Sequence, residues 1–168
     1  MTKSISKHVL TYMLWVFLIC VPFLPWLIRE IDKPPLREQG IEVAVQGKLR
    51  NTFVAILVYL NKNGNYPSAE NWQDLLLPYL DNRKDALKLP TKVNITNTIA
   101  LNLKAKPDSP KDVVLLFEST GGWNAYGQSE LLAPTSNGKP GCFIVFNDGY
   151  IEFISPQQAK NLNWGNNP

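Results

Sequence analysis

The chain has 168 residues, of which 45% are hydrophobic and 18% charged, and its formal net charge is +3. This length accommodates one compact domain of about 100 residues beside an N-terminal hydrophobic segment, and it excludes an arrangement of several domains. The small charge, without a run of Lys and Arg, excludes the basic stripe of a nucleic-acid-binding protein. His8 is the only histidine and precedes the hydrophobic segment, which excludes a Ser-His-Asp triad or a His-ligated zinc site in the domain that follows.

Residues 9–28 run for twenty residues without a charge. A helix of this length crosses about 30 Å of hydrocarbon, so we predict a transmembrane helix at 9–28 after a cytoplasmic segment at 1–8. A cleaved signal peptide is the alternative, but no small-x-small site follows the apolar run, where Trp26 and Arg29 stand instead. We therefore expect an uncleaved anchor, joined to the domain by a linker at 29–40.

The next pattern predicts an amphipathic helix over residues 36–63, because apolar residues recur there at three- and four-residue spacing. Gly64 stands where a helix C-cap is expected. We expect the apolar stripe to pack on a sheet, with packing against neighbouring subunits as the weaker alternative. The stripe consists of Ile41, Val45, Leu49, Phe53, Ile56, Leu57 and Leu60.

A second, short helix is predicted after a turn, with Ser68 as its cap and Trp72 on its buried side. A further helical turn is predicted at 81–87. Residues 92–104 and 112–119 are rich in β-branched and other apolar residues, which favours strands.

Residues 121–139 read as a long loop rich in Gly, Asn and Ser, which we expect to carry Trp123 and Tyr126 inward or across the sheet edge. An aromatic plug is the simpler role for this pair, and a stacking platform for a sugar or peptide is the alternative.

Residues 141–153 alternate as two strands joined at Asp148-Gly149, a dipeptide that predicts a type I′ hairpin turn. A short helix capped by Ser155 should follow. The tail at 163–168 is expected to fray.

Four segments in the same order resemble a known family. They are KLRNTFVAILVYLNKNGNYPSAENWQDLLLPYL at 48–80, VVLLFES at 113–119, GWNAYGQSELL at 122–132 and GCFIVFNDGYIEFI at 141–154. Together they are similar to bacterial pseudopilin-like proteins of the prepilin-type-processing-associated His-x9-Asp-Gly group.

The resemblance implies a single-pass protein of the bacterial inner membrane with its amino terminus in the cytoplasm. It also implies an α+β fold, in which a pilin-like domain at 41–162 packs a long amphipathic helix on a small antiparallel β-sheet in the periplasm or outside the cell. The sequence departs from the family at Gly138, which stands in the place of the motif histidine. It also lacks a prepilin peptidase site of the Gly-Phe-Thr-Leu-Ile-Glu type near its N-terminus.

The expected function is therefore that of a membrane-anchored, non-enzymatic protein acting through protein contacts in a type II secretion or type IV pilus-like envelope system. Its expected partners are the lipid bilayer and other envelope or pseudopilin-like proteins. The alternative is a stand-alone tethered module that recognises a ligand through the 121–139 loop.

The Asp148-Gly149 dipeptide has two interpretations. It is placed there for the positive φ of a turn, or it contributes to a Ca²⁺ site of the kind that related secreted pseudopilins hold in their loops. Such a cation takes about six to eight oxygen ligands. The candidate ligands are Asp148, Asn147, Glu118, Asn124 and Glu130. No catalytic residue and no cofactor besides this ion is predicted, because no nucleophile motif accompanies the Glu118 and Glu130 pair.

Overall fold

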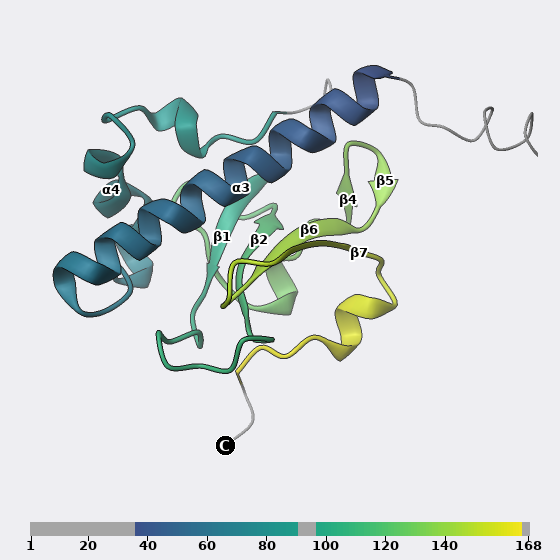
Figure 1. Ribbon diagram of the computed structural model, residues 1–168. Helices are drawn as coiled ribbons and strands as arrows, with labels where there is room; N and C mark the ends of the chain where they lie inside the picture. The colour runs from purple at the N-terminus through teal and green to yellow at the C-terminus, as the bar shows by residue number, and fades with distance from the viewer. Residues whose placement is uncertain (1–35, 91–96, 166–168) are drawn as a thin grey trace, which may run out of the picture. The chain divides into compact units, whose positions relative to one another are not determined.

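The computed structural model of the protein describes residues 36–90 and 97–165, and Figure 1 shows its arrangement. The chain divides into two units, Met1–Leu36 and Arg37–Pro168, and the fold described below is that of the second. The predicted transmembrane helix at 9–28 and the cytoplasmic segment at 1–8 lie outside the described residues. Within the ranges that are described, none of the helices is both long and apolar enough to cross a bilayer.

The long helix α3 (Leu36–Asn63) begins and ends where the sequence predicted, so its first five residues belong to the segment assigned to the linker. Gly64 follows with a φ of 78°, and its N–H donates to the carbonyl of Leu60 at 2.7 Å. A glycine in this left-handed conformation ends a helix without the steric strain that a Cβ would add.

The sheet under α3 has five strands in the order β3-β1-β2-β6-β7. Neighbouring strands are antiparallel except β1 and β3, which are parallel. A separate two-stranded ribbon joins β4 and β5. The strands are β1 (Thr98–Asn102), β2 (Val114–Ser119), β3 (Tyr126–Gly127), β4 (Thr135–Ser136), β5 (Lys139–Pro140), β6 (Cys142–Phe146) and β7 (Ile151–Ile154).

Short helices connect these elements. The predicted second helix is present as α4 (Trp72–Leu76), preceded by η2 (Ala69–Asn71) and continued by η3 (Leu77–Tyr79). The predicted turn at 81–87 contains η4 (Lys84–Leu87). The segment predicted as a loop at 121–139 contains β3, η5 (Ser129–Leu131), β4 and the first residue of β5, and η6 (Gln158–Asn161) follows β7.

The two faces of the sheet bury separate apolar clusters. Phe143 and Val145 face α3, together with Val45 and Leu49 of the helix. Ile144 faces the opposite side, as the predicted alternation requires. Trp164 also lies on that side, where its ring meets Phe117 edge to face at 5.2 Å. Residues 163–168 were expected to fray, but Trp164, in the described part of that segment, is buried in the second cluster.

The α+β architecture, with a helix packed on a small and mostly antiparallel sheet, is thus confirmed. One detail of the helix prediction is wrong. Leu57 was placed in the buried stripe of α3, but it is 40% exposed and lies on the outward side of the helix. Of the two positions expected for Trp123 and Tyr126, inward or across the edge of the sheet, the structure excludes the inward one, because both side chains are exposed. Tyr126 lies in β3, the edge strand.

The turn between β6 and β7 is the second correction, since the predicted type I′ turn requires a positive φ at both Asp148 and Gly149. Only Gly149 has one, at 86°. The Gly149 N–H donates to the Phe146 carbonyl, and the Phe146 N–H donates to the Tyr150 carbonyl, both at 2.9 Å. This is a three-residue loop that ends in a left-handed glycine. A Cβ on Gly149 would lie 2.5 Å from Phe53 of α3, so the glycine also lets the hairpin approach the helix.

Candidate functional site

Glu118 is a buried carboxylate in the middle of the fold. Its Oε1 accepts a hydrogen bond from the Ser136 hydroxyl at 3.0 Å, and its Oε2 accepts one from the Phe143 N–H at 2.7 Å. Burial raises the pKa of this carboxyl, and hydrogen bonds from Phe143, Ser136 and Asn97 oppose the rise. Glu118 therefore joins β2 to β4 and β6, and its oxygens are bonded within the protein.

Asn147 and Asp148 are adjacent in the turn at the other end of β6. The Asp148 Oδ1 accepts a hydrogen bond from the Tyr150 N–H at 2.9 Å. The Asn147 Oδ1 accepts one from the Tyr66 hydroxyl at 2.8 Å, and its amide nitrogen donates to the Ser109 carbonyl at 2.8 Å. These contacts account for the pair as a turn that is fastened to the neighbouring loops.

The remaining two candidate ligands have other partners. Asn124 donates to the Asp74 carboxylate at 2.6 Å and accepts from the Gln73 N–H at 2.8 Å. Glu130 accepts from the Gln128 N–H at 2.8 Å within its own loop. The structure brings Asn147 and Asp148 together and places Glu118, Asn124 and Glu130 elsewhere. Across the described ranges, no three His, Cys, Asp or Glu residues form a group that could hold a metal ion.

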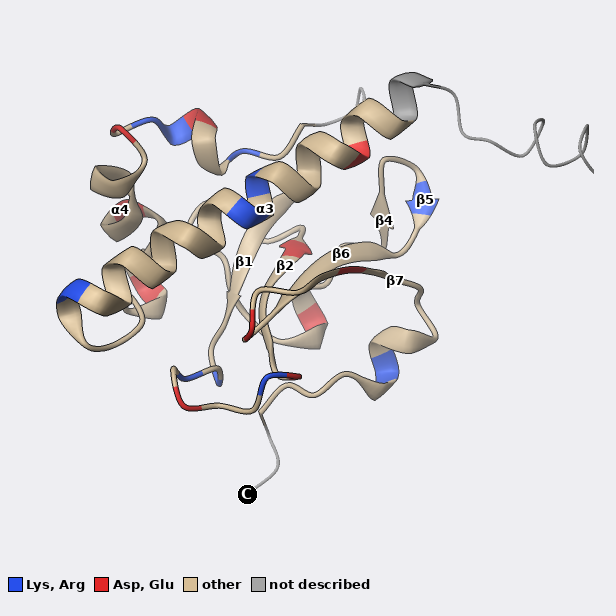
Figure 2. Ribbon diagram, in the orientation of Figure 1, with Lys and Arg blue, Asp and Glu red and all other residues tan. Residues whose placement is uncertain are grey.

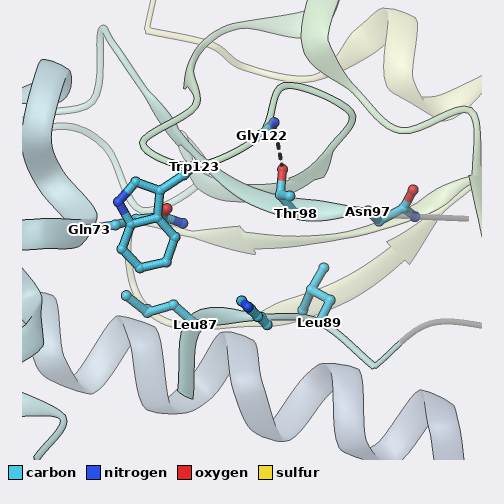
Figure 3. Close-up of a pocket in the computed structure, with 8 residues that line it drawn as sticks. Gln73, Leu87, Leu89, Asn97, Thr98, Gly122 and Trp123 are labelled. Carbon is cyan, nitrogen blue, oxygen red and sulfur yellow. Dashed lines mark hydrogen bonds between the residues drawn. The ribbon is translucent and has the colours of Figure 1, made fainter. Parts of the chain in front are cut away.

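A pocket of about 350 Å³ lies beside Trp123, between α4, η4 and the start of β1. Figure 3 shows that Leu87, Leu89 and the indole ring surround its interior. The pocket is lined by Gln73, Leu87, Lys88, Leu89, Asn97, Thr98, Gly122 and Trp123.

Most polar side chains around this pocket are hydrogen-bonded within the protein, and the exposed Lys88 is the exception among the described lining residues. Gln73 accepts from the Asn124 N–H at 2.7 Å and donates to the Ile99 carbonyl at 3.2 Å. The Trp123 indole donates to Asp74 at 3.1 Å, and the Lys84 ammonium lies 5.2 Å from the centre of the indole ring. The hydrogen bond from Asn124 is the main reason that the pKa of Asp74 is lowered. The pocket thus offers mainly apolar surface, with the Lys88 ammonium as a polar group at its lining.

The outer face of α3 is the surface of the helix that is turned away from the sheet. Four of the eight large apolar residues exposed in the described part of the chain lie on it: Val43 (68%), Val54 (51%), Val58 (47%) and Leu57 (40%). Since α3 also buries an apolar stripe against the sheet, it is apolar on two sides. Such a helix is typical of a protein interior, and exposed apolar patches mark interaction sites.

Small residues continue the outer face toward the N-terminal end of α3. Gly40, Ala44 and Gly47 are exposed, and a Cβ added at either glycine would meet nothing within 4 Å. Near the other end, a groove of about 340 Å³ runs beside Val54 and Val58. A second helix could approach the first part closely because the residues at positions 40, 44 and 47 have no side chain or only a methyl group.

Sequence reasoning missed this outer face, although the spacing of Val43, Gly47, Val54 and Val58 follows one side of a helix as well as the buried stripe does. No family model, curated protein or solved structure matches the chain.

Proposed function

We propose that the protein is a membrane-anchored, non-enzymatic, pseudopilin-like component of an envelope assembly of the secretion or type IV pilus-like kind. Residues 9–28 would anchor it in the inner membrane and hold its α+β domain on the outer side. The outer face of α3 would then contact a helix of a neighbouring subunit.

The outer face of α3 is the observation that carries the proposal. A patch containing Val43, Val54, Leu57 and Val58 exposes apolar surface to water without a contribution to the domain's own core. Glycine and alanine at positions 40, 44 and 47 suit close packing of a second helix. The exposed Arg50 lies between Gly47 and Val54 on α3, where Figure 2 marks positive positions on the ribbon, so a partner helix would have to pair with this cation or leave it at the edge of the contact.

The test is a pair of charges placed on this face. Val54→Asp combined with Val58→Asp puts two carboxylates in the proposed contact, whereas Leu103→Asp places one on an exposed apolar residue outside α3. Because all three sites are exposed, folding should change little in either variant. Complexes extracted from membranes in mild detergent should retain wild type and Leu103→Asp and should lose the double variant. Recovery of the double variant in the same complexes would refute the proposal.

The pocket beside Trp123 favours a second candidate, a tethered module that binds an apolar ligand through the 121–139 loop. The two candidates differ in what the anchor does. Replacement of residues 9–28 by an unrelated membrane helix should abolish function in an assembly and preserve it in a tethered module. Trp123→Ala should preserve function if the protein acts in an assembly and abolish it if the protein is a tethered module.

A further inference from the structure

The outermost strand β7 has one side without a neighbouring strand, as its position at the end of the sheet in Figure 1 shows. The Phe146 N–H donates to the Tyr150 carbonyl, which fixes the alternation of hydrogen-bonded pairs between β6 and β7. Glu152 and Ile154 therefore point their backbone groups at β6. It follows that the N–H and C=O groups of Ile151 and Phe153 point away from the sheet.

These outward groups have no partner in the described part of the chain, since no hydrogen bond there reaches the backbone of Ile151 or Phe153 from outside the sheet. A row of unpaired N–H and C=O groups is a template for one kind of partner, an extended chain segment. An added strand would exchange backbone hydrogen bonds with both residues.

A groove runs along this edge and would receive the side chains of such a segment. It has a volume of about 420 Å³ and lies between β7 and the first half of α3. The rings of Phe143 and Phe153 meet edge to face at 5.2 Å beside it, and Tyr150 is 60% exposed. The groove is lined by Glu42, Gln46, Lys139, Phe143, Tyr150, Ile151, Glu152 and Phe153.

The charges beside the free edge of β7 limit which partner can pair with it. The Glu152 side chain alternates with Ile151 and Phe153 and lies on the side of the sheet away from α3. Glu42 forms an ion pair with Lys139, whereas Glu152 has no ion-pair partner among the described residues. The charge that remains beside the edge of β7 is therefore negative and is carried by Glu152. In antiparallel pairing between two copies that uses both Ile151 and Phe153, the two Glu152 side chains would lie directly opposite each other, which is destabilising. A second copy of the chain is thus a poor partner, and a segment with a cation at this position is a good one.

We propose that the free edge of β7 binds an extended peptide segment of a partner protein as a sixth strand of the sheet. The segment carries Lys or Arg opposite Glu152, and the apolar residues on either side of that cation face α3 and enter the groove. This site is separate from the outer face of α3, so its test does not depend on the proposed assembly.

The test uses the full chain in detergent micelles and a capped hexapeptide, acetyl-Ser-Val-Lys-Val-Thr-Ser-amide. Two control peptides replace Lys by Glu or carry N-methyl groups on both valines. N-methylation removes the hydrogen bonds that the valines would donate to β7 and places methyl groups between the strands. Fluorescence anisotropy of labelled peptides gives affinities, and amide hydrogen exchange reports on Ile151 and Phe153. Glu152→Lys reverses the charge at the site, and Glu70→Lys is the control on an exposed residue of η2.

The Lys peptide should bind and slow the exchange of the Ile151 and Phe153 amides, and the N-methylated peptide should do neither. Glu152→Lys should weaken binding of the Lys peptide about tenfold and strengthen binding of the Glu peptide. Glu70→Lys should change neither affinity in this way. The proposal is overturned if peptides of either charge bind equally, or if the two amides exchange at unchanged rates. It is also overturned if their protection rises with protein concentration in the absence of peptide, which would indicate pairing between copies.

Discussion

Replacement of Glu118 by Gln should remove a pH dependence of folding stability. Burial raises the pKa of this carboxyl in the folded protein, so the fold favours the protonated form. The stabilisation is complete below the ordinary glutamate pKa of about 4.3, and it is lost as the pH rises through the raised folded value. One titrating group changes the unfolding free energy by at most about 1.4 kcal/mol per pH unit. Gln does not titrate and lacks this slope.

The hydrogen bonds of Glu118 set the size of the effect at low pH. A Gln oxygen can still accept from the Phe143 N–H, and its amide can donate to the Ser136 hydroxyl oxygen, so these two of the three contacts survive, while Asn97 keeps its bond to the Thr135 carbonyl. Glu118→Gln should therefore stay within about 1 kcal/mol of wild type at pH 4. Glu118→Ala leaves two buried donors unpaired at about 1–3 kcal/mol each, which predicts a loss of about 2–6 kcal/mol.

The assay is urea unfolding of the full chain in micelles, followed by tryptophan fluorescence from pH 4 to pH 8. The unfolding free energy of Glu118→Gln should rise relative to wild type as the pH rises, and should then level off. Parallel pH profiles for the two proteins, or a wild type that gains on the variant with pH, would refute this account of the buried carboxylate.

Three further predictions concern single positions. Gly149→Ala should lower the unfolding free energy by about 1–2 kcal/mol because of the left-handed conformation, and by roughly 1–3 kcal/mol more because a Cβ there meets Phe53. Gly64 has the same sign of φ but open space around it, so Gly64→Ala should show only the first of these losses. Equal losses in the two variants, measured by urea unfolding, would contradict the contact with Phe53. Gly47→Ala should raise stability by about 0.5–1 kcal/mol in urea unfolding, yet reduce recovery in membrane complexes if a second helix packs there; a loss of stability would contradict its exposed helical position. Burial, and secondarily the charge of Glu118, raises the pKa of the Cys142 thiol to about 12, so in a Cys20→Ser background iodoacetamide should modify it only as the protein unfolds, and rapid labelling of the folded protein would count against this burial.

The sequence predicted those features well that depend only on residues close together in the chain, such as the ends and caps of helices. The bounds of α3 follow from its apolar periodicity and from Gly64, whose left-handed conformation ends the helix. The capping pattern at Ser155 is also present, with its N–H and hydroxyl both bonded to the Gln158 side chain at 2.8 Å.

Features that depend on distant residues were not predictable in the same way. Burial of Trp164 requires Phe117 on a strand far away in the sequence. The hairpin turn differs from the expected type because the Phe146 and Tyr150 backbones pair and leave three residues in the loop. Spacing also could not separate Ile56 from Leu57, which are neighbours in the chain but face the core and the solvent respectively.

The candidate metal ligands show the same limit. Asn147 and Asp148 are neighbours in the chain and therefore in space, whereas the placement of Glu118 is decided by β4 and β6, which close around it. The pocket beside Trp123 joins residues from α4, η4, β1 and a loop. No motif in the sequence marks either arrangement, because both arise from the packing of separate elements.

Photo-crosslinking along α3 in intact membranes tests whether the outer face of α3 contacts other proteins. A photoreactive amino acid is placed in turn at Val43, Val54 and Val58 on the outer face, and at Lys106 and Gln157, which are exposed away from α3. We expect crosslinks to discrete envelope proteins from the three α3 positions and none from the two controls. Equal yields from all five positions, or crosslinks to lipid alone from α3, would contradict the outer face of α3 as a protein-contact surface.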